Sequence, residues 1–210
     1  MTSSNEPDRP IPLIAIDGPA GSGKSTVSQA LARRLGLDRL DTGAMYRALT
    51  WAALQRGIQP DDRVAVGRLA RQLTITVGER VVADGTDVTD AIRGPEVSGS
   101  VSTVAAHPEV RAVLVERQRQ WAAEHGGGIV EGRDIGSVVL PDADLKIYLT
   151  ATASVRAGRR PEEEAGALAR RDRLDSTREA SPLGVADGAK VIDTTDRPVE
   201  DIVEEVATWL

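Results

Sequence analysis

Apolar positions near the start of the chain follow two different spacings, one after the other. Residues 11–17 form a largely apolar run of the length expected for a buried strand. Val27, Ala30, Leu31 and Leu35 then recur at i, i+3, i+4 and i+8, which places them on one face of a helix. A glycine-rich stretch separates the two patterns. The chain is therefore predicted to begin with a strand, a tight loop and a helix.

The same alternation of patterns continues through most of the sequence. Further strands are predicted over residues 127–132, 145–149 and 190–193. Helices are predicted over 41–56, 95–106, 108–124 and 198–210, with another beginning near residue 154, and residues 37–40 are interpreted as a short apolar link. This order indicates an α/β protein with four or five strands in a mostly parallel central sheet, flanked by helices on both faces. Ligands in such sheets bind at the carboxyl ends of the strands.

Residues 61–93 break the alternation. They read as a short helix followed by short strands and tight turns, which predicts a small antiparallel insert. We therefore expect a core made of residues 11–60 and 94–210, an inserted subdomain over 61–93, and a flexible tail over residues 1–10.

Composition and charge exclude several classes of function. The net charge of −6 argues against a broad nucleic-acid surface, although residues 156–178 hold seven arginines against five acids and could face an anion. The absence of cysteine excludes disulfides and thiolate chemistry. The polar residues 1–10 lack the apolar core of a signal peptide, and no apolar run is long enough for a membrane helix. We expect a cytoplasmic monomer that binds neither membranes nor nucleic acid.

The glycine-rich stretch between the first strand and helix matches the phosphate-binding pattern G-x-x-x-x-G-K-[ST] at every fixed position. Glycines let consecutive N–H groups point at one anion, and the next helix starts with its positive end there. The lysine adds a charge for the β and γ phosphates, and the Ser25 hydroxyl is the expected Mg²⁺ ligand. ATP and Mg²⁺ are the predicted donor and cofactor, bound by Gly18, Pro19, Ala20, Gly21, Ser22, Gly23, Lys24, Ser25 and Thr26.

Phosphoryl transfer also needs arginines that converge on the moving group. Arg47 and Arg111 lie on predicted helices, where a lone arginine is most often a solvated surface residue. Arg133 differs because it stands beside Asp134 between two glycines at the end of a predicted strand. His107 and His125 have no ligand-like spacing and are interpreted as structural.

Four motifs together resemble the bacterial cytidylate kinase family, which acts on CMP and dCMP. They are IDGPAGSGKS at 16–25, LDTGAMYR at 40–47, EGRDIG at 131–136 and RDRLDSTR at 171–178. The first motif is common to many P-loop kinases, whereas the other three together are specific. The resemblance implies a P-loop kinase fold with an insert that binds the nucleoside monophosphate and a lid, which is short in this chain and covers about residues 156–174.

The resemblance also implies roles for individual residues. Lys24, Arg133 and Arg171 match catalytic positions, and Ser102, Arg111 and Asp134 match those that read cytosine. Asp175 and Arg178 match positions that hold the sugar. The full set implied for CMP is Thr42, Tyr46, Arg47, Ser102, Arg111, Arg133, Asp134, Arg171, Asp175 and Arg178.

The chain departs from the family pattern at the lid. Only ten residues, 161–170, separate Arg160 from Arg171, which is shorter than usual. The lid normally excludes water from ATP, so the shortening leaves open whether Arg156, Arg160 and Arg170 face ATP.

Two alternatives to a cytidylate kinase follow from the P-loop alone. One is a kinase for another nucleotide or a coenzyme precursor. The other is a GTP-dependent switch, which predicts an N-K-x-D motif for guanine, but none of the three lysines has aspartate two residues later.

Overall fold

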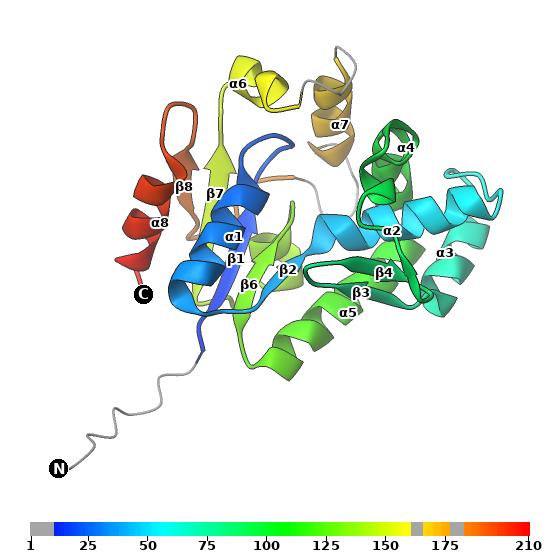
Figure 1. Ribbon diagram of the computed structural model, residues 1–210, viewed down its shortest axis with the longest axis horizontal. Helices are drawn as coiled ribbons and strands as arrows, with labels where there is room; N and C mark the ends of the chain where they lie inside the picture. The colour runs from blue at the N-terminus through cyan, green and yellow to red at the C-terminus, as the bar shows by residue number, and fades with distance from the viewer. Residues whose placement is uncertain (1–10, 161–165, 177–182) are drawn as a thin grey trace.

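The computed structural model describes residues 11–160, 166–176 and 183–210. Five parallel strands form the central sheet in the order β2-β6-β1-β7-β8 (Figure 1). Their bounds are β1 Leu13–Asp17, β2 Arg39–Asp41, β6 Gly128–Glu131, β7 Leu145–Thr150 and β8 Lys190–Asp193. The carboxyl ends point to the top of Figure 1, where α6 and α7 lie. The predicted mostly parallel sheet is confirmed.

Helices enclose this sheet on both faces. Most of them run close to the predicted ranges, and α1 and α8 pack side by side on one face (Figure 1). Their bounds are α1 Lys24–Leu35, α2 Thr42–Gln55, α3 Arg63–Gln72, α4 Pro95–Ala106, α5 Pro108–His125, α6 Ala153–Gly158, α7 Ala167–Ser176 and α8 Val199–Ala207. No helix in the described ranges is both long and apolar enough to cross a membrane.

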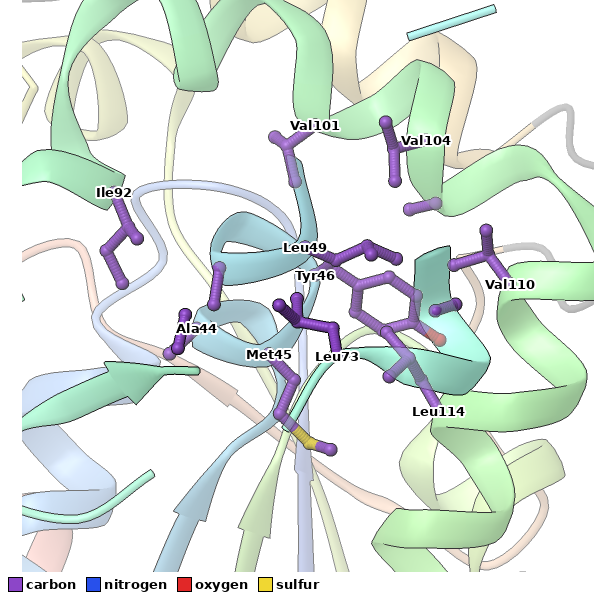
Figure 2. Close-up of a cluster of buried hydrophobic side chains, with 14 of the residues drawn as sticks. Ala44, Met45, Tyr46, Leu49, Leu73, Ile92, Val101, Val104, Val110 and Leu114 are labelled. Carbon is purple, nitrogen blue, oxygen red and sulfur yellow. The ribbon is translucent and has the colours of Figure 1, made fainter. Parts of the chain in front are cut away.

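Alternation along the strands divides the core into two clusters. Ile14 and Ile16 of β1 point to the face covered by α1 and α8, where they pack with Ile147 and Ile202. Ala15 points to the other face, where the second cluster lies between the sheet and helices α2 to α5. Figure 2 shows part of this second cluster, with Tyr46 and Leu49 of α2 among apolar side chains from α4 and α5.

A second, three-stranded sheet follows α3, as predicted for an antiparallel insert. It pairs β3 (Ile75–Val77) with β4 (Val81–Ala83) and β4 with β5 (Thr86–Asp87), both antiparallel. Asp84 and Gly85 both have positive φ, which makes the tight turn between β4 and β5. Side chains of the insert pack into the same cluster as α2 and α4. The proposed division of the chain into subdomains stays a prediction.

Helix α7 was not predicted from the sequence, and two segments near the ends of the strands also differ from the expectations. Part of the predicted link at 37–40 belongs to the edge strand β2, whose Leu40 pairs with Val130 of β6. After β6, residues Ile135–Val139 form a π-helical segment that the pattern did not indicate. Both lie beside the carboxyl ends of the strands, and both carry or position residues of the candidate site.

Candidate active site

The P-loop, residues 18–25, joins β1 to α1 and is held in a conformation that only glycine adopts easily. Gly21 and Gly23 have φ of 75° and 87°. A Cβ added at Gly18 would lie 2.1 Å from the carbonyl oxygen of Leu149. The loop is therefore pressed against β7 with its backbone amides gathered at the start of α1, which is the geometry of an anion site.

Lys24 is buried beneath this loop. Its side chain is largely enclosed, and Nζ donates a hydrogen bond to the carbonyl oxygen of Pro19 at 2.7 Å. Burial, followed by the nearby charge of Arg133, lowers the pKa of Lys24 well below its usual value. Ser22 Oγ is also buried and has no hydrogen-bond partner among the described residues. A bound phosphate would supply both groups with an acceptor, so the loop fits a nucleotide's phosphates.

Glu131 ends β6 directly beside the P-loop and binds two serines of α1, the first of which is the last residue of the loop. Its carboxylate accepts hydrogen bonds from Ser25 Oγ and Ser28 Oγ, each at 3.0 Å, and from Arg39 Nη1 at 2.5 Å. Burial, followed by repulsion from Asp41, raises the pKa of Glu131. No role for this glutamate was predicted from the sequence. Its place at the carboxyl end of a strand was the available signal.

A cavity of about 490 Å³ opens in front of the P-loop. It is lined by seven basic side chains, which come from segments spread along the chain, against only two acidic ones. The basic residues are Lys24, Arg47, Arg93, Arg133, Arg159, Arg160 and Arg197, and the acidic residues are Asp41 and Glu131. In a protein whose net charge is −6, this concentration of positive charge indicates a polyanionic ligand.

A smaller cavity of about 70 Å³ adjoins it, between α2, α4 and the end of β6. Arg111 and Asp134 form a buried ion pair in its wall. Arg111 also donates a hydrogen bond to the Tyr46 hydroxyl at 3.4 Å, and its guanidinium lies 5.9 Å from the Tyr46 ring centroid. The wall of the cavity thus holds a hydrogen-bond donor, the Arg111 guanidinium, beside an acceptor, the Asp134 carboxylate.

Arg133 stands where the two cavities meet. It lines both, together with Gly43, Arg47 and Gly132. Its Nε donates to Asp175 Oδ2 at 3.0 Å, and Ser102 Oγ donates to Asp175 Oδ1 at 3.4 Å. Asp175 of α7 therefore joins the end of β6 to α4 across the small cavity.

Arg47 is held firmly by the structure around it. Its Nη1 donates to the carbonyl oxygen of Ile92 and to Ser98 Oγ, each at 2.9 Å. The fixed guanidinium lines both cavities. On the same helix, Thr42 Oγ1 donates to the carbonyl oxygen of Glu131 at 2.7 Å, which ties the start of α2 to β6.

Asp17, the last residue of β1, supports the site from behind. Its two carboxylate oxygens accept the backbone N–H groups of Ile135 and Gly136, both at 2.8 Å. These bonds fix the π-helical segment that follows Arg133 and Asp134. Burial raises the pKa of Asp17 to about 6, against the lowering effect of the two backbone hydrogen bonds.

The predicted site residues that the structure describes gather at this one edge of the sheet. Arg178 and the side chain of Arg171 lie outside the described part of the chain. Among the lid arginines, Arg160 lines the large cavity, whereas Arg156 Nη1 contacts the carbonyl oxygen of Ala20 at 3.1 Å and Arg170 is exposed. His107 and His125 each bond a backbone carbonyl, as expected for structural residues.

Arg159 and Thr194 contact the P-loop, although neither contact was predicted from the sequence. Arg159 donates to Gly21 O at 3.3 Å and to Thr194 Oγ1 at 2.9 Å, and Thr194 Oγ1 donates to Ser22 O at 3.0 Å. This chain of bonds ties the P-loop to residues beyond β8. No local motif around Thr194 signals it, because the contact arises only when β8 joins the sheet.

Comparison with known proteins gives a consistent result. A family model described as cytidylate kinase matches residues 14–210. A cytidylate kinase of Desulfitobacterium hafniense (strain Y51) is 51% identical over 209 residues, which are 92% of this chain and 90% of that protein. A bifunctional pantoate ligase/cytidylate kinase of Parasynechococcus marenigrum (strain WH8102) is 50% identical over 212 residues. The match covers 92% of this chain but only 42% of the relative, so the chain spans less than half its length.

Solved structures resemble the chain in fold. A gluconokinase from Sinorhizobium meliloti 1021 superposes with a TM-score of 0.53 at 15% identity, covering 96% of this chain and 92% of that one. At this identity the likeness concerns the architecture alone.

Proposed function

Because the chain belongs to the cytidylate kinase family, we propose that it transfers the γ-phosphoryl group of ATP to a phosphate oxygen of CMP or dCMP. The observation that carries this proposal is the meeting of two unlike cavities at Arg133. One is large and strongly basic, as a triphosphate requires, and the other holds a paired donor and acceptor suited to a nucleobase. A phosphate from each side would meet at the arginine.

On the donor side, the P-loop amides and Lys24 would hold the β and γ phosphates, and Ser25 would be the protein's ligand to Mg²⁺. Bound Mg²⁺ neutralises charge on the phosphate oxygens. We add Glu131 to this site. Because its carboxylate accepts a hydrogen bond from the Ser25 hydroxyl, with 3.0 Å between the two oxygens, the serine's lone pairs are left free to face the metal.

On the acceptor side, Asp134 and Arg111 would read the cytosine edge. Cytosine offers an N4 donor beside N3 and O2 acceptors. Asp134 Oδ1 could accept from N4, while Arg111 and Ser102 donate to the ring. Uracil would turn a carbonyl toward Asp134 and leave a buried acceptor unpaired, which costs about 1–3 kcal/mol.

Transfer itself needs little covalent chemistry from the protein. The attacking phosphate is already anionic at neutral pH, so no general base is required. Lys24, Arg133 and Arg171 would align the two phosphates and offset the charge of the moving group. The cytoplasmic location, the monomeric state and the role of the shortened lid remain predictions.

A coupled assay of ADP release tests the function. The protein is supplied with ATP, Mg²⁺ and each of CMP, dCMP, UMP, AMP and GMP in turn. We expect CMP or dCMP to give the highest kcat/KM. Faster turnover of AMP or GMP would contradict the cytosine assignment and favour a kinase for another nucleotide.

A further inference from the structure

Helix α7 carries two acidic residues one turn apart, Asp172 and Asp175, and each of them contacts a different cavity wall. In Figure 1 α7 (gold) lies between α6 (yellow) and α4 (green), above the carboxyl ends of the strands. Residues three apart lie on the same face of a helix. One face of α7 therefore spans both halves of the site.

The Asp175 end belongs to the small cavity. Its carboxylate is buried and accepts hydrogen bonds from Arg133 Nε at 3.0 Å and Ser102 Oγ at 3.4 Å. Both partners line the small cavity. A ligand that fixes Arg133 and Ser102 in this wall therefore also fixes the position of α7 through Asp175.

The Asp172 end meets the P-loop. Its Oδ2 accepts from Arg156 Nη1 at 2.5 Å, and its Oδ1 accepts from the backbone N–H of Ala20 at 3.4 Å. Arg156 Nη1 also donates to the carbonyl oxygen of Ala20 at 3.1 Å. Asp172, Arg156 and Ala20 thus form a closed triangle at the start of the loop.

Two further observations separate this triangle from an ordinary surface ion pair. The side chains of Arg156 and Asp172 are only 16% and 20% exposed, so solvent screens the pair weakly. The loop also packs directly on Arg156, because a Cβ added at Gly21 would lie 2.8 Å from the Arg156 carbonyl oxygen. A displacement of the Asp172 carboxylate would therefore move the P-loop backbone, through Arg156 and Ala20.

We propose that Asp172 is a positioning residue that couples occupancy of the small cavity to nucleotide affinity in the large one. When α7 is seated by Asp175, Asp172 fixes Arg156 and Ala20 in the arrangement that receives the phosphates. Coupling of this kind is reciprocal, so each ligand strengthens the binding of the other by the same factor. The inference rests on the proposed function, since it takes CMP and ATP as the two ligands.

The test is a set of binding titrations without turnover. The dissociation constant of the β,γ-imido analogue of ATP, with Mg²⁺, is measured with and without saturating CMP. The proteins compared are the native chain, Asp172→Asn, Asp172→Glu and the exposed-site control Asp142→Asn. We expect CMP to tighten analogue binding about tenfold in the native protein and the control. The factor should fall below about twofold in Asp172→Asn and partly recover in Asp172→Glu.

The dissociation constant of CMP, measured without the ATP analogue, distinguishes a loss of coupling from a loss of CMP binding. In Asp172→Asn it should stay within about twofold of native, because the Asp175 contacts are retained. If the variant also loses CMP affinity, Asp172 serves the stability of α7 rather than coupling, and the proposal is wrong. Equal coupling factors in native and variant proteins also overturn it. Failure of the native chain to bind CMP would instead contradict the proposed function.

Discussion

Arg133 is the side chain on which both halves of the site depend. It has three fixed features: an ion pair with Asp175 at 3.0 Å, a hydrogen bond to Gly132 O at 3.2 Å, and a place in the walls of both cavities. Because the guanidinium is already held in place, it can stabilise the charge that develops between two phosphates without a free-energy cost for moving the side chain.

Replacing Arg133 by alanine should lower kcat/KM for CMP by about a hundredfold, which corresponds to about 2.7 kcal/mol. The fold should be retained, because the side chain lies at a cavity wall rather than in either apolar cluster. Steady-state kinetics and circular dichroism measure the two effects. Arg80→Ala, which removes an exposed ion pair, is the matched control. A loss within about threefold would remove Arg133 from the reaction.

Asp17 gives the folded protein a distinct pH dependence. Its pKa is raised from 3.8 to about 6, so between these values the folded state binds a proton that the unfolded state has released. This contribution to the free energy of unfolding is therefore greatest at low pH and is lost as the pH rises through about 6. A shift of this size corresponds to about 3 kcal/mol.

Asp17→Asn removes this titration. The variant loses a hydrogen-bond acceptor at every pH, but its deficit relative to native should shrink by up to about 3 kcal/mol as the pH rises from about 4 to about 7.5. Urea unfolding across this range measures the difference. A deficit that is constant with pH, or that grows, would show that Asp17 does not titrate as described.

At the scale of elements, the P-loop is positioned by the strand and helix it contacts. Gly21 and Gly36 offer a matched pair for testing this. Both have positive φ, of 75° and 66°, but an added Cβ meets Arg156 O at 2.8 Å at position 21 and nothing within 4 Å at position 36.

Alanine at either glycine should cost about 1–2 kcal/mol of unfolding free energy from backbone strain alone. Only Gly21→Ala should also displace the loop from α6 and weaken binding of the ATP analogue, by about tenfold or more. Urea unfolding and ligand titration of both variants test this. Equal affinities in the two proteins would mean that contact between the loop and α6 does not set the geometry of the site.

Elements also differ in how far the sequence predicts them. The P-loop and its flanking strand and helix follow from local patterns, because a run of buried-strand length, glycines and a helical spacing are all contiguous. Strand β2 has only three residues, Arg39–Asp41, too few to show an alternation. Its pairing with β6 comes from residues some 90 positions away in the chain, as with Leu40 and Val130. Tertiary pairing of this kind leaves no local signal.

The same limit applies to the site. The resemblance to cytidylate kinases is confirmed by the family match, and the motifs it rests on supply most of the cavity lining. The roles predicted for individual side chains stay predictions. Glu131 and Asp172 both lie within these motifs, but no role for either was predicted from the sequence. Their contacts with Ser25 and Ala20 depend on how β6 and α7 meet the P-loop, which is a property of the folded chain.

At the scale of the whole molecule, charge is separated between surface and site. The protein carries a net charge of −6, while the large cavity gathers seven basic side chains against two acidic ones. An anionic substrate is thus attracted locally by a protein that repels it at long range. Such an interaction depends strongly on ionic strength.

Raising the salt concentration from about 0.05 M to about 0.5 M should increase KM for ATP by about threefold to tenfold, with a smaller increase for CMP. The difference follows from charge, since ATP carries more of it into the basic cavity. Initial rates at several salt concentrations, with ionic composition otherwise fixed, give both constants. A KM for ATP that does not change with salt would argue that the cavity's arginines are not the residues that hold it.

The buried lysine of the P-loop links nucleotide binding to proton uptake. Within the described residues, Lys24 Nζ donates its one hydrogen bond to the carbonyl oxygen of Pro19, and burial holds the pKa of Lys24 well below the usual value. A phosphate placed against Nζ adds negative charge to that of Glu131 and Asp17 and raises the pKa of Lys24. At pH values where the free protein holds Lys24 partly neutral, binding should therefore draw protons from solution. Calorimetric titrations in buffers of different ionisation enthalpy would record this uptake as a buffer-dependent heat, and Lys24→Met would abolish it.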